Sequence, residues 1–344
     1  MPSALEIDEL IRVRAAQGEP QKAIARDLGV TEWRVRTVLR AQLTATVVRR
    51  GTKEVRLHTV SAKPPRFLCR VAVLSDIHIP YHDHGALGIA MQFLREWKPS
   101  VIVLNGDILD AHEVSSHPKE RHNVVTFQDE IDEVRQFLRV LRHDHSEARI
   151  CYTMGNHENR IERYLTNHAP ELSSVTSLSL CTLLDLPELR IEFFDARQKV
   201  CLHGVEFFHG SIIRKDAGNS VRAHVAKRGG SVVMGHTHRM ATVARRDKHG
   251  ASWGVENGHL SNPDPTWCLD PDWQQGFTTL ELTDDAVAIQ QRVIDGGRML
   301  ADGKLWTAEA NDGGKQRREQ GRVSAERVAR NHPCAGDRMR KRRR

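Results

Sequence analysis

Three apolar runs in the first half of the chain each end in a cluster of Asp, Asn or His. The runs are Arg70–Leu74, Ser100–Leu104 and Arg149–Thr153. Two stretches with helical periodicity, Gly85–Trp97 and Val124–His143, separate them. Strands that alternate with helices predict crossover units and a sheet of parallel strands. Because the carboxyl ends of such strands meet at one edge, we expect the polar clusters to converge there.

After about residue 190 the helical periodicity fades and short apolar segments follow one another directly. The strands that we expect are Glu192–Phe194, Val200–Leu202, Val205–His209, Ser231–Met234, Ser252–Glu256, Phe277–Leu282 and Ala286–Val293. Strands joined by helices thus give way to consecutive strands. This order predicts an α/β fold in which two sheets pack face to face with helices outside.

Five segments that follow predicted strands carry side chains typical of metal ligands. In chain order they are Asp76-x-His78, Gly106-Asp107-x-x-Asp110, Gly155-Asn156-His157-Glu158, His209-Gly210 and Gly235-His236-x-His238. A pair of divalent ions needs several oxygen and nitrogen ligands that converge from different strands. Each motif alone is equally typical of an ordinary turn at the end of a strand. The specific signal is the presence of all five in this order.

These motifs resemble those of the calcineurin-like metallophosphoesterases, in particular members from phages and bacteria, which are related to the SbcD-type nucleases. The resemblance covers roughly residues 71–293. It implies a four-layer α-β-β-α sandwich of two mixed sheets with helices outside. It does not extend to the protein Ser/Thr phosphatases, because Ala111-His112 stands where that subfamily has Arg-Gly. The SbcD-type nucleases usually carry Asp where this chain has Glu158.

The resemblance also implies a role for each residue of the motifs. The implied ligands are Asp76, His78 and His238 for one metal ion, Asn156, His209 and His236 for the other, and Asp107 as the bridge. The nucleophile in that family is a water or hydroxide bound to the metal ions. We expect two divalent ions, manganese first, with iron, zinc or nickel as alternatives. His157 is implied to protonate the leaving oxygen or to stabilise the phosphoryl charge.

Further polar residues follow the motifs closely. His157 has a reference pKa of about 6.5, which suits general acid catalysis. We expect Asp110 and Glu158 to orient imidazoles, or alternatively to cap helix N-termini. Arg160, His82 and His112 are candidates for substrate contacts, and a solvated helix face is the alternative for Arg160.

The segment before the motifs has the spacing of a helix-turn-helix domain. Helices are expected at Ile7–Ala16, Gln21–Leu28 and Glu32–Leu43, with Gly29 in the turn and Thr31 as an N-cap. The second helix of such a motif packs on the third, whose free face enters the major groove. The candidate DNA contacts on that face are Trp33, Arg34, Arg36 and Arg40. The alternative is a small module for protein binding or dimerisation.

The charge is distributed unevenly along the chain. The net charge of +7 combines +6 in residues 1–66, −8 in residues 67–313 and +9 in residues 314–344. The middle also holds 17 of the 19 histidines. We therefore expect a helix-turn-helix domain at 1–46, a basic linker with a short strand near Glu54–Val60 at 47–68, a phosphoesterase domain at 69–300 and a disordered Arg-rich tail at 301–344. Basic ends around an acidic middle favour DNA as a partner.

No apolar run is long enough for a membrane span, and the first residues lack the apolar core of a secretory signal. The six cysteines form no CxxC pair, so we expect the cytoplasm of a bacterium or of a phage-infected cell. The sequence leaves the oligomeric state open.

Three hypotheses about function remain at this point. The first is a nuclease that cleaves phosphodiesters in DNA and is tethered by its N-terminal domain. The second is a phosphomonoesterase or a cyclic-nucleotide phosphodiesterase. The third is a DNA-binding regulator with a vestigial phosphoesterase domain, against which the complete set of candidate ligands argues.

Overall fold

The chain forms two compact units, Met1–Arg66 and Phe67–Arg344. The computed structural model describes residues 4–40, 47–50, 53–56, 68–117, 125–248, 250–265, 268, 270–284 and 286–308. Most of the expected disordered tail, from residue 309 onward, lies outside these residues. Among the residues described, no helix is both long enough and apolar enough to cross a membrane.

The described residues of the first unit form three helices and a hairpin. They are α1 (Ala4–Ala16), α2 (Gln21–Asp27), α3 (Glu32–Arg40), β1 (Val47–Arg50) and β2 (Lys53–Arg56). The helices pack around Ile11, Ile24 and Val35, whose side chains are fully buried. As expected, Thr31 begins α3 and accepts a hydrogen bond from the Arg34 N–H at 3.2 Å. The short strand expected near 54–60 is instead the second strand of the hairpin.

The second unit begins with alternating strands and helices. In order they are β3 (Cys69–Leu74), α4 (His84–Trp97), β4 (Val101–Leu104), α5 (Phe127–Asp144), β5 (Arg149–Thr153), α6 (Asn159–His168), η1 (Pro170–Leu172), η2 (Thr176–Leu178), α7 (Leu180–Leu183) and β6 (Ile191–Phe194). Local signals set the helix starts. Asp83 caps α4 by accepting from the Ala86 N–H at 2.9 Å. Thr126 and Asp129 form a capping box at the start of α5.

The rest of the second unit is mostly strands. They are β7 (Val200–Leu202), β8 (Val205–Phe207), β9 (Ser231–Met234), β10 (Met240–Asp247), β11 (Gly250–Asn257), β12 (Gly276–Leu282), β13 (Val287–Val293), β14 (Arg298–Ala301) and β15 (Lys304–Thr307), with one helix, α8 (Asn219–Arg228). They build two mixed sheets. The six-stranded sheet has the order β13-β12-β3-β4-β5-β6, and the five-stranded sheet has the order β10-β11-β9-β8-β7.

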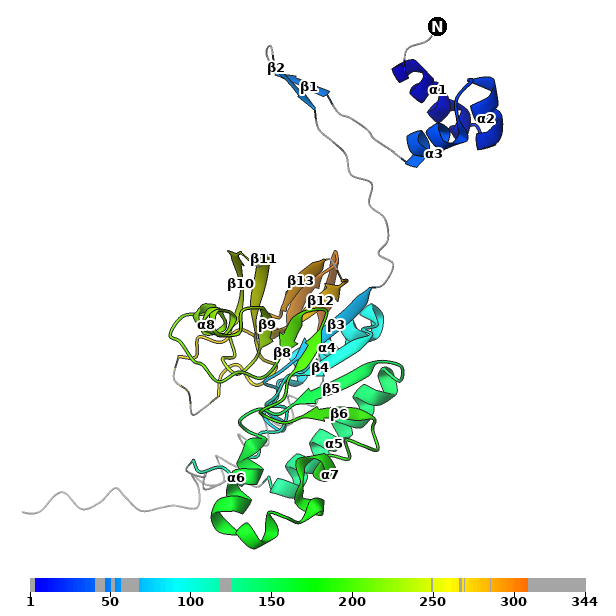
Figure 1. The fold of residues 1–344 in the computed structure, drawn as a ribbon. Helices are drawn as coiled ribbons and strands as arrows, with labels where there is room; N and C mark the ends of the chain where they lie inside the picture. The colour runs from blue at the N-terminus through cyan, green and yellow to red at the C-terminus, as the bar shows by residue number, and fades with distance from the viewer. Residues whose placement is uncertain are drawn as a thin grey trace, which may run out of the picture. The chain divides into compact units, whose positions relative to one another are not determined.

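The alternation of side chains along the central strands creates the layers. On β3, Val71 and Val73 face the other sheet and pack with residues such as Phe207 and Val233. Ala72 and Leu74 point to the opposite side, where they belong to the cluster that includes α4 and α5. A separate cluster joins α8 to the outer face of the five-stranded sheet. Figure 1 shows both sheets between α8 on one side and α4 and α5 on the other, so the expected four-layer α-β-β-α sandwich is confirmed.

The structure corrects one boundary of the expected tail. We expected disorder from residue 301, but β14 and β15 form a hairpin that reaches Thr307. Its inner face buries Met299 and Trp306 in the core that covers the six-stranded sheet. The aromatic ring of Trp306 packs edge-on against Phe93 of α4 with 5.4 Å between ring centroids. The hairpin is therefore part of the core of the second unit.

Candidate metal centre

The polar motifs lie in the turns directly after β3, β4, β5, β8 and β9, where the two sheets meet. Five of their residues other than glycine have a left-handed backbone. They are Asp76, His78 and Asp107, each with φ of 53°, His236 with φ of 72° and His238 with φ of 58°. Residues other than glycine rarely adopt this backbone conformation, and it persists only where the surrounding structure holds it. Such strain in consecutive turns is typical of functional sites.

One donor group joins the two sheets through Asp76, His78 and His238, whose candidate ligand atoms all lie within 4.8 Å of one another. The Nε2 atoms of His78 and His238 are 3.1 Å apart, and His238 Nε2 lies 3.4 Å from Asp76 Oδ1. The backbone N–H of His236 donates to both carboxylate oxygens of Asp76, at 2.9 and 3.1 Å. These contacts hold the Asp76 carboxylate between two sheets.

A second donor group consists of Asp107, His209 and His236. His209 Nε2 lies 3.2 Å from Asp107 Oδ2 and 3.0 Å from Asn156 Oδ1. The other ring nitrogen of His209 donates to the Asn105 carbonyl at 3.0 Å, which leaves Nε2 as the coordinating atom. Asp107 also belongs to a third group with His78 and His157, so its carboxylate lies between the two sides of the centre.

The charges of this cluster suit cations. Burial favours the neutral form of Asp107, but the charges of His209 and His157 outweigh it and lower the pKa of this carboxyl well below its usual range. Burial likewise disfavours a charged His209, but the Asp107 carboxylate raises its pKa to about 10. The buried carboxylates thus attract positive charge into the centre.

The donor set fits two divalent ions. Carboxylate oxygens, imidazole nitrogens and an amide oxygen are ligands for manganese, iron, zinc or nickel. The ring nitrogens of His78 and His238 face each other at 3.1 Å, an arrangement that a shared cation stabilises. One ion fits Asp76, His78 and His238, and the other fits Asn156, His209 and His236, with Asp107 between them.

His157, Asp110 and Arg160 form a linked group beside the donor atoms. Asp110 Oδ1 lies 2.9 Å from His78 Nδ1 and 3.0 Å from His157 Nδ1. Arg160 donates to the Asp110 carbonyl at 2.8 Å and to His157 Nε2 at 2.9 Å. Burial lowers the pKa of His157, but the carboxylates of Asp107 and Asp110 outweigh it and raise the pKa above the usual value. The Asp110 carboxylate thus contacts two imidazoles, those of His78 and His157.

Glu158 has a different role from the one expected. Among the described residues, its buried carboxylate forms no hydrogen bond or ion pair with an imidazole, and it does not cap α6 through its side chain. It accepts backbone hydrogen bonds from Asp107 at 3.0 Å, Ile108 at 2.8 Å and Gly155 at 2.8 Å, and one from the Tyr152 hydroxyl at 2.7 Å. Glu158 therefore links two turns, one that carries Asp107 and one that carries Asn156.

Gly155 leaves room for this arrangement. A Cβ atom at position 155 would lie 2.1 Å from Asp107 Oδ1 and 2.7 Å from Glu158 Oε2. Real side chains do not approach so closely, so any other residue would displace the Asp107 carboxylate. The glycine that precedes Asn156 is thus required by close packing.

The remaining substrate candidates lie around the centre. The His82 side chain is only 8% exposed and lies 3.8 Å from the Glu133 carboxylate, which places it under the surface. The backbone N–H of His112 donates to the buried Glu130 carboxylate, and its ring packs edge-on against Tyr81. Both histidines are thus only partly exposed.

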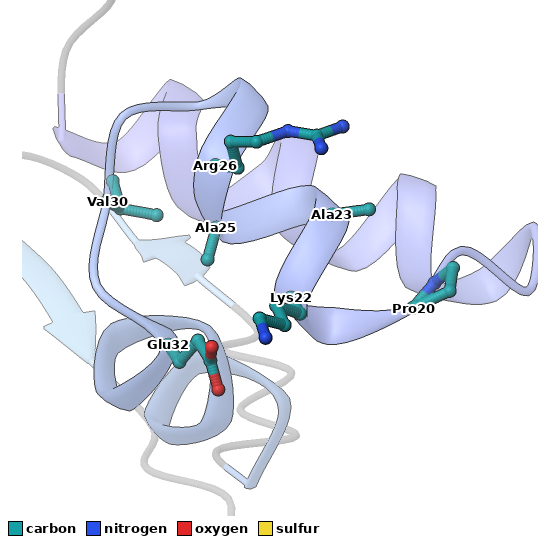
Figure 2. Close-up of a pocket in the computed structure, with 7 residues that line it drawn as sticks. All are labelled: Pro20, Lys22, Ala23, Ala25, Arg26, Val30 and Glu32. Atoms are coloured by element: carbon teal, nitrogen blue, oxygen red, sulfur yellow. The ribbon is translucent and has the colours of Figure 1, made fainter.

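The candidate DNA contacts in the first unit differ from one another. Arg34 donates to the Asp8 carboxylate of α1 at 3.2 Å, whereas the Arg36 side chain is 55% exposed. The side chains of Trp33 and Arg40 lie outside the described part of the chain. Figure 2 shows a hollow nearby whose lining mixes both charges: Pro20, Lys22, Ala23, Ala25, Arg26, Val30 and Glu32.

Sequence reasoning missed three residues next to the donor groups. Asn105 is fully buried and donates across the sheets to the Phe208 carbonyl at 3.0 Å. His259 is also fully buried and stacks on His238, with 5.1 Å between centroids and 14° between planes. Trp273 packs against the same imidazole at 4.3 Å. Asn105 could have been identified from the sequence, because it directly precedes Gly106-Asp107. His259 and Trp273 follow no motif.

Comparisons with known proteins agree with the geometry. The model of the calcineurin-like phosphoesterase family matches residues 69–240. The gene 54 proteins of Mycobacterium phages L5 and D29 are each 27% identical to this chain over 253 residues, which is 69% of the chain and 98% of each relative.

Two solved structures are also similar at low sequence identity. Vacuolar protein sorting 29 from Cryptosporidium parvum is 16% identical, with a TM-score of 0.39 over 70% of this chain and 95% of that one. The phosphoesterase YfcE from E. coli is 14% identical, with a TM-score of 0.31 over 70% of this chain and all of that one. The family match spans half of the chain and includes all five motifs. The chain therefore belongs to the calcineurin-like phosphoesterase family and is a metal-dependent hydrolase of phosphate esters.

Proposed function

We propose that this enzyme cleaves phosphodiester bonds in DNA and that its N-terminal unit holds the substrate. The observation that carries the hydrolytic part is the meeting of two donor groups at Asp107, beside His157 and Arg160. Two divalent ions at these residues, with manganese as our first choice, would activate a water molecule and neutralise phosphate oxygens. The following steps concern the protein's own side chains.

His157 and Arg160 are placed to act on the leaving group and on the phosphate. In the free enzyme the Arg160 guanidinium donates to His157 Nε2, so the proton of a neutral ring is on Nδ1, next to Asp110. A phosphate that enters the centre offers Arg160 a stronger, charge-assisted acceptor. When Arg160 moves to this acceptor, His157 Nε2 becomes available to carry a proton to the leaving oxygen. Asp110 stabilises the imidazolium that this requires.

The case for DNA rests on the first unit. Its second and third helices pack through Ala25, Ile24 and Val35 and are joined by a tight turn at Gly29, whose φ is +64°. This packing supports the proposal of a helix-turn-helix domain, in which the third helix would read the major groove. The exposed Arg36 lies on that helix. Residues 1–66 carry a net charge of +6, which favours contact with phosphates.

One panel of substrates tests the hydrolytic part. With manganese added, wild type and Asp107→Asn are compared on bis-p-nitrophenyl phosphate, p-nitrophenyl phosphate and linear single- and double-stranded DNA. We expect wild type to cleave the diester and DNA, and Asp107→Asn to lose at least about 100-fold in rate on every substrate. Cleavage of the monoester alone, with DNA intact, would contradict the nuclease. Full activity of Asp107→Asn would contradict the bridging role.

A second experiment tests the tether in the full-length chain. Arg36→Glu should weaken DNA binding and reduce the slope of binding against salt concentration, with hydrolysis of bis-p-nitrophenyl phosphate unchanged. Arg197→Glu makes the same charge change at an exposed turn of the second unit and serves as the matched control. Equal binding by both variants and wild type would show that α3 does not hold DNA.

A further inference from the structure

An indole ring borders the candidate metal centre without being a ligand. Trp273 packs edge-on against the imidazole of His238, with 4.3 Å between ring centroids and 60° between planes. It also lies 5.5 Å from the ring of His259. The Trp273 side chain is only partly buried, so part of the ring faces outward beside a ligand of the proposed centre.

The structure holds the loop of Trp273 firmly in place. The residue before it, Asp272, pairs with the buried Arg239 at 3.0 Å. The residue after it, Gln274, donates its backbone N–H to the His238 carbonyl at 2.9 Å. Fixed contacts on both sides mean that the indole is positioned before any ligand arrives. A rigid aromatic side chain loses little conformational entropy when a second ring packs on it.

The layer behind Trp273 and His238 is also aromatic. His259 stacks on His238 and is fully buried, and its Nδ1 lies 2.8 Å from the Ser261 hydroxyl. His238 and His259 thus form an aromatic layer behind Trp273.

A second exposed aromatic residue borders the same centre. Tyr81 comes three residues after His78, is 38% exposed and packs edge-on against His112 at 6.0 Å. The extended segment His259–Asn262 connects the two aromatic loops, because His259 pairs with Gln275 and the Asn262 N–H donates to the Tyr81 carbonyl at 2.9 Å. The edge of the centre thus carries two partly exposed rings on a shared backbone support.

We propose that Trp273 stacks on the nucleobase next to the scissile phosphate, so that the enzyme acts on esters of nucleotides. A nucleobase next to the phosphate would engage both the donor groups and the indole. Nucleobases stack on aromatic side chains with little dependence on sequence, which suits an enzyme that cleaves a polymer. The proposal rests on the proposed phosphodiesterase function and names the part of the substrate that the site recognises.

The test compares two diesters with the same leaving group in the full-length enzyme with manganese. One is the p-nitrophenyl ester of thymidine 5′-monophosphate, and the other is methyl p-nitrophenyl phosphate, which has no base. We expect wild type to have a KM about tenfold lower for the thymidine ester. Trp273→Leu should abolish this difference, so that the two diesters have equal KM values. Trp273→Phe should retain most of it, and Trp253→Leu, in β11, serves as the matched control.

Two outcomes would overturn the proposal. If Trp273→Leu lowers the rate on both diesters equally and weakens manganese binding, Trp273 only orients His238. If the preference for the thymidine ester survives in Trp273→Leu, the base is recognised elsewhere.

A separate measurement applies if neither diester is cleaved, which would refute the phosphodiesterase function itself. Inhibition of p-nitrophenyl phosphate hydrolysis is then compared for thymidine 5′-monophosphate and methyl phosphate. Stacking predicts that the nucleotide inhibits about tenfold more strongly in wild type and not in Trp273→Leu. Equal inhibition by both phosphates in wild type would refute stacking as well.

Discussion

At the scale of single residues, Glu158 organises the candidate centre from outside the donor groups. Its carboxylate accepts hydrogen bonds from the backbone of two different turns, and each turn carries a proposed ligand. These hydrogen-bond donors surround the buried Glu158 carboxylate closely, so no water molecule can take its place. Removal of the carboxylate charge leaves all of these donors without an acceptor, whereas removal of one donor costs only its own hydrogen bond.

We expect Glu158→Gln to lower the free energy of unfolding by about 2–3 kcal/mol, because the amide presents N–H groups to backbone N–H groups. Tyr152→Phe removes one of the same hydrogen bonds and keeps the charge, so its loss should be about 1 kcal/mol. Urea unfolding followed by circular dichroism measures both. Equal losses in the two variants would show that the carboxylate is not the organising group.

A prediction about function at the same scale concerns Gly155. The added methyl group of Gly155→Ala would meet Asp107 Oδ1 at 2.1 Å and push this carboxylate away from the donor groups. A displacement of about 1 Å is enough to reduce kcat by about 100-fold. Gly230→Ala is the control, since nothing lies within 4 Å of a Cβ atom there. Steady-state hydrolysis of bis-p-nitrophenyl phosphate checks both, and equal rates would contradict the close approach.

Most residues of the candidate centre could be identified from the sequence, because each motif begins where a predicted strand ends. Asp76, Asp107 and His238 each follow an apolar run within a few residues, so topology alone predicts their convergence. His259 also follows an expected strand, Ser252–Glu256, but it was missed because Asn257-Gly258-His259 matches none of the five motifs. Its place beside His238 depends on how β11 and β12 pack in different sheets. Sequence periodicity carries no such information.

At the scale of elements, α5 carries a buried carboxyl group that makes stability depend on pH. Burial, together with the charge of Asp110, raises the pKa of Glu130 to about 8 from 4.5. A folded pKa above the unfolded value means that protonated Glu130 stabilises the fold fully below about pH 4.5. This stabilisation is lost as the pH rises toward 8.

Glu130→Gln removes this dependence and keeps one oxygen for the His112 N–H. We expect the variant to gain at least about 1 kcal/mol over wild type between pH 5 and pH 8. Glu133→Gln on the same helix, where the side chain is 42% exposed, should follow wild type at both pH values. Urea unfolding at pH 5 and pH 8 measures these differences in the free energy of unfolding. The same change with pH in wild type and Glu130→Gln would refute the raised pKa of Glu130.

The β14–β15 hairpin gives a second prediction for an element. Trp306 is 7% exposed against Phe93, whereas its neighbour Leu305 is 59% exposed on the other face. Trp306→Ala should therefore destabilise the second unit by about 3–5 kcal/mol, and Leu305→Ala by less than about 0.5 kcal/mol. Thermal unfolding measures the difference. A small effect of Trp306→Ala would mean that the hairpin does not belong to the core.

The elements differ in how well the sequence predicts them. Buried strands such as β5 match the predicted bounds because every side chain after the first is apolar or fully enclosed. β10 was missed because its outer half, Arg245–Asp247, is exposed and polar, and its pairing with β11 supplies the order instead. The hairpin at 298–307 was missed for the same reason, since alternate side chains such as Leu300 and Lys304 face solvent.

At the scale of the whole molecule, the proposed ions connect the two sheets. Asp76 and Asp107 extend from the six-stranded sheet, and His209 and His238 extend from the five-stranded sheet. Ions that bind only the folded chain add to its stability, by about 2.7 kcal/mol at a free concentration 100 times Kd. We expect a chelator to lower the Tm of wild type by several degrees.

Asp107→Asn should show a much smaller shift on chelation, because it lacks the carboxylate between the two donor groups. Asp132→Asn, an exposed carboxylate on α5, should respond as wild type does. Calorimetry with and without the chelator gives the comparison. An unchanged Tm in wild type would show that the donor groups hold no ion.

The left-handed turns of the centre also bear on whether such a site can be transplanted. Asp76, His78, Asp107, His236 and His238 each occupy a backbone region that an isolated peptide avoids. A short peptide that copies one motif would relax to an ordinary conformation and lose the direction of its donor atom. Grafting all five motifs onto a scaffold whose sheets have a different curvature would require the left-handed backbone to be imposed at each of these five residues. An engineer who wants this chemistry elsewhere must move both sheets with it.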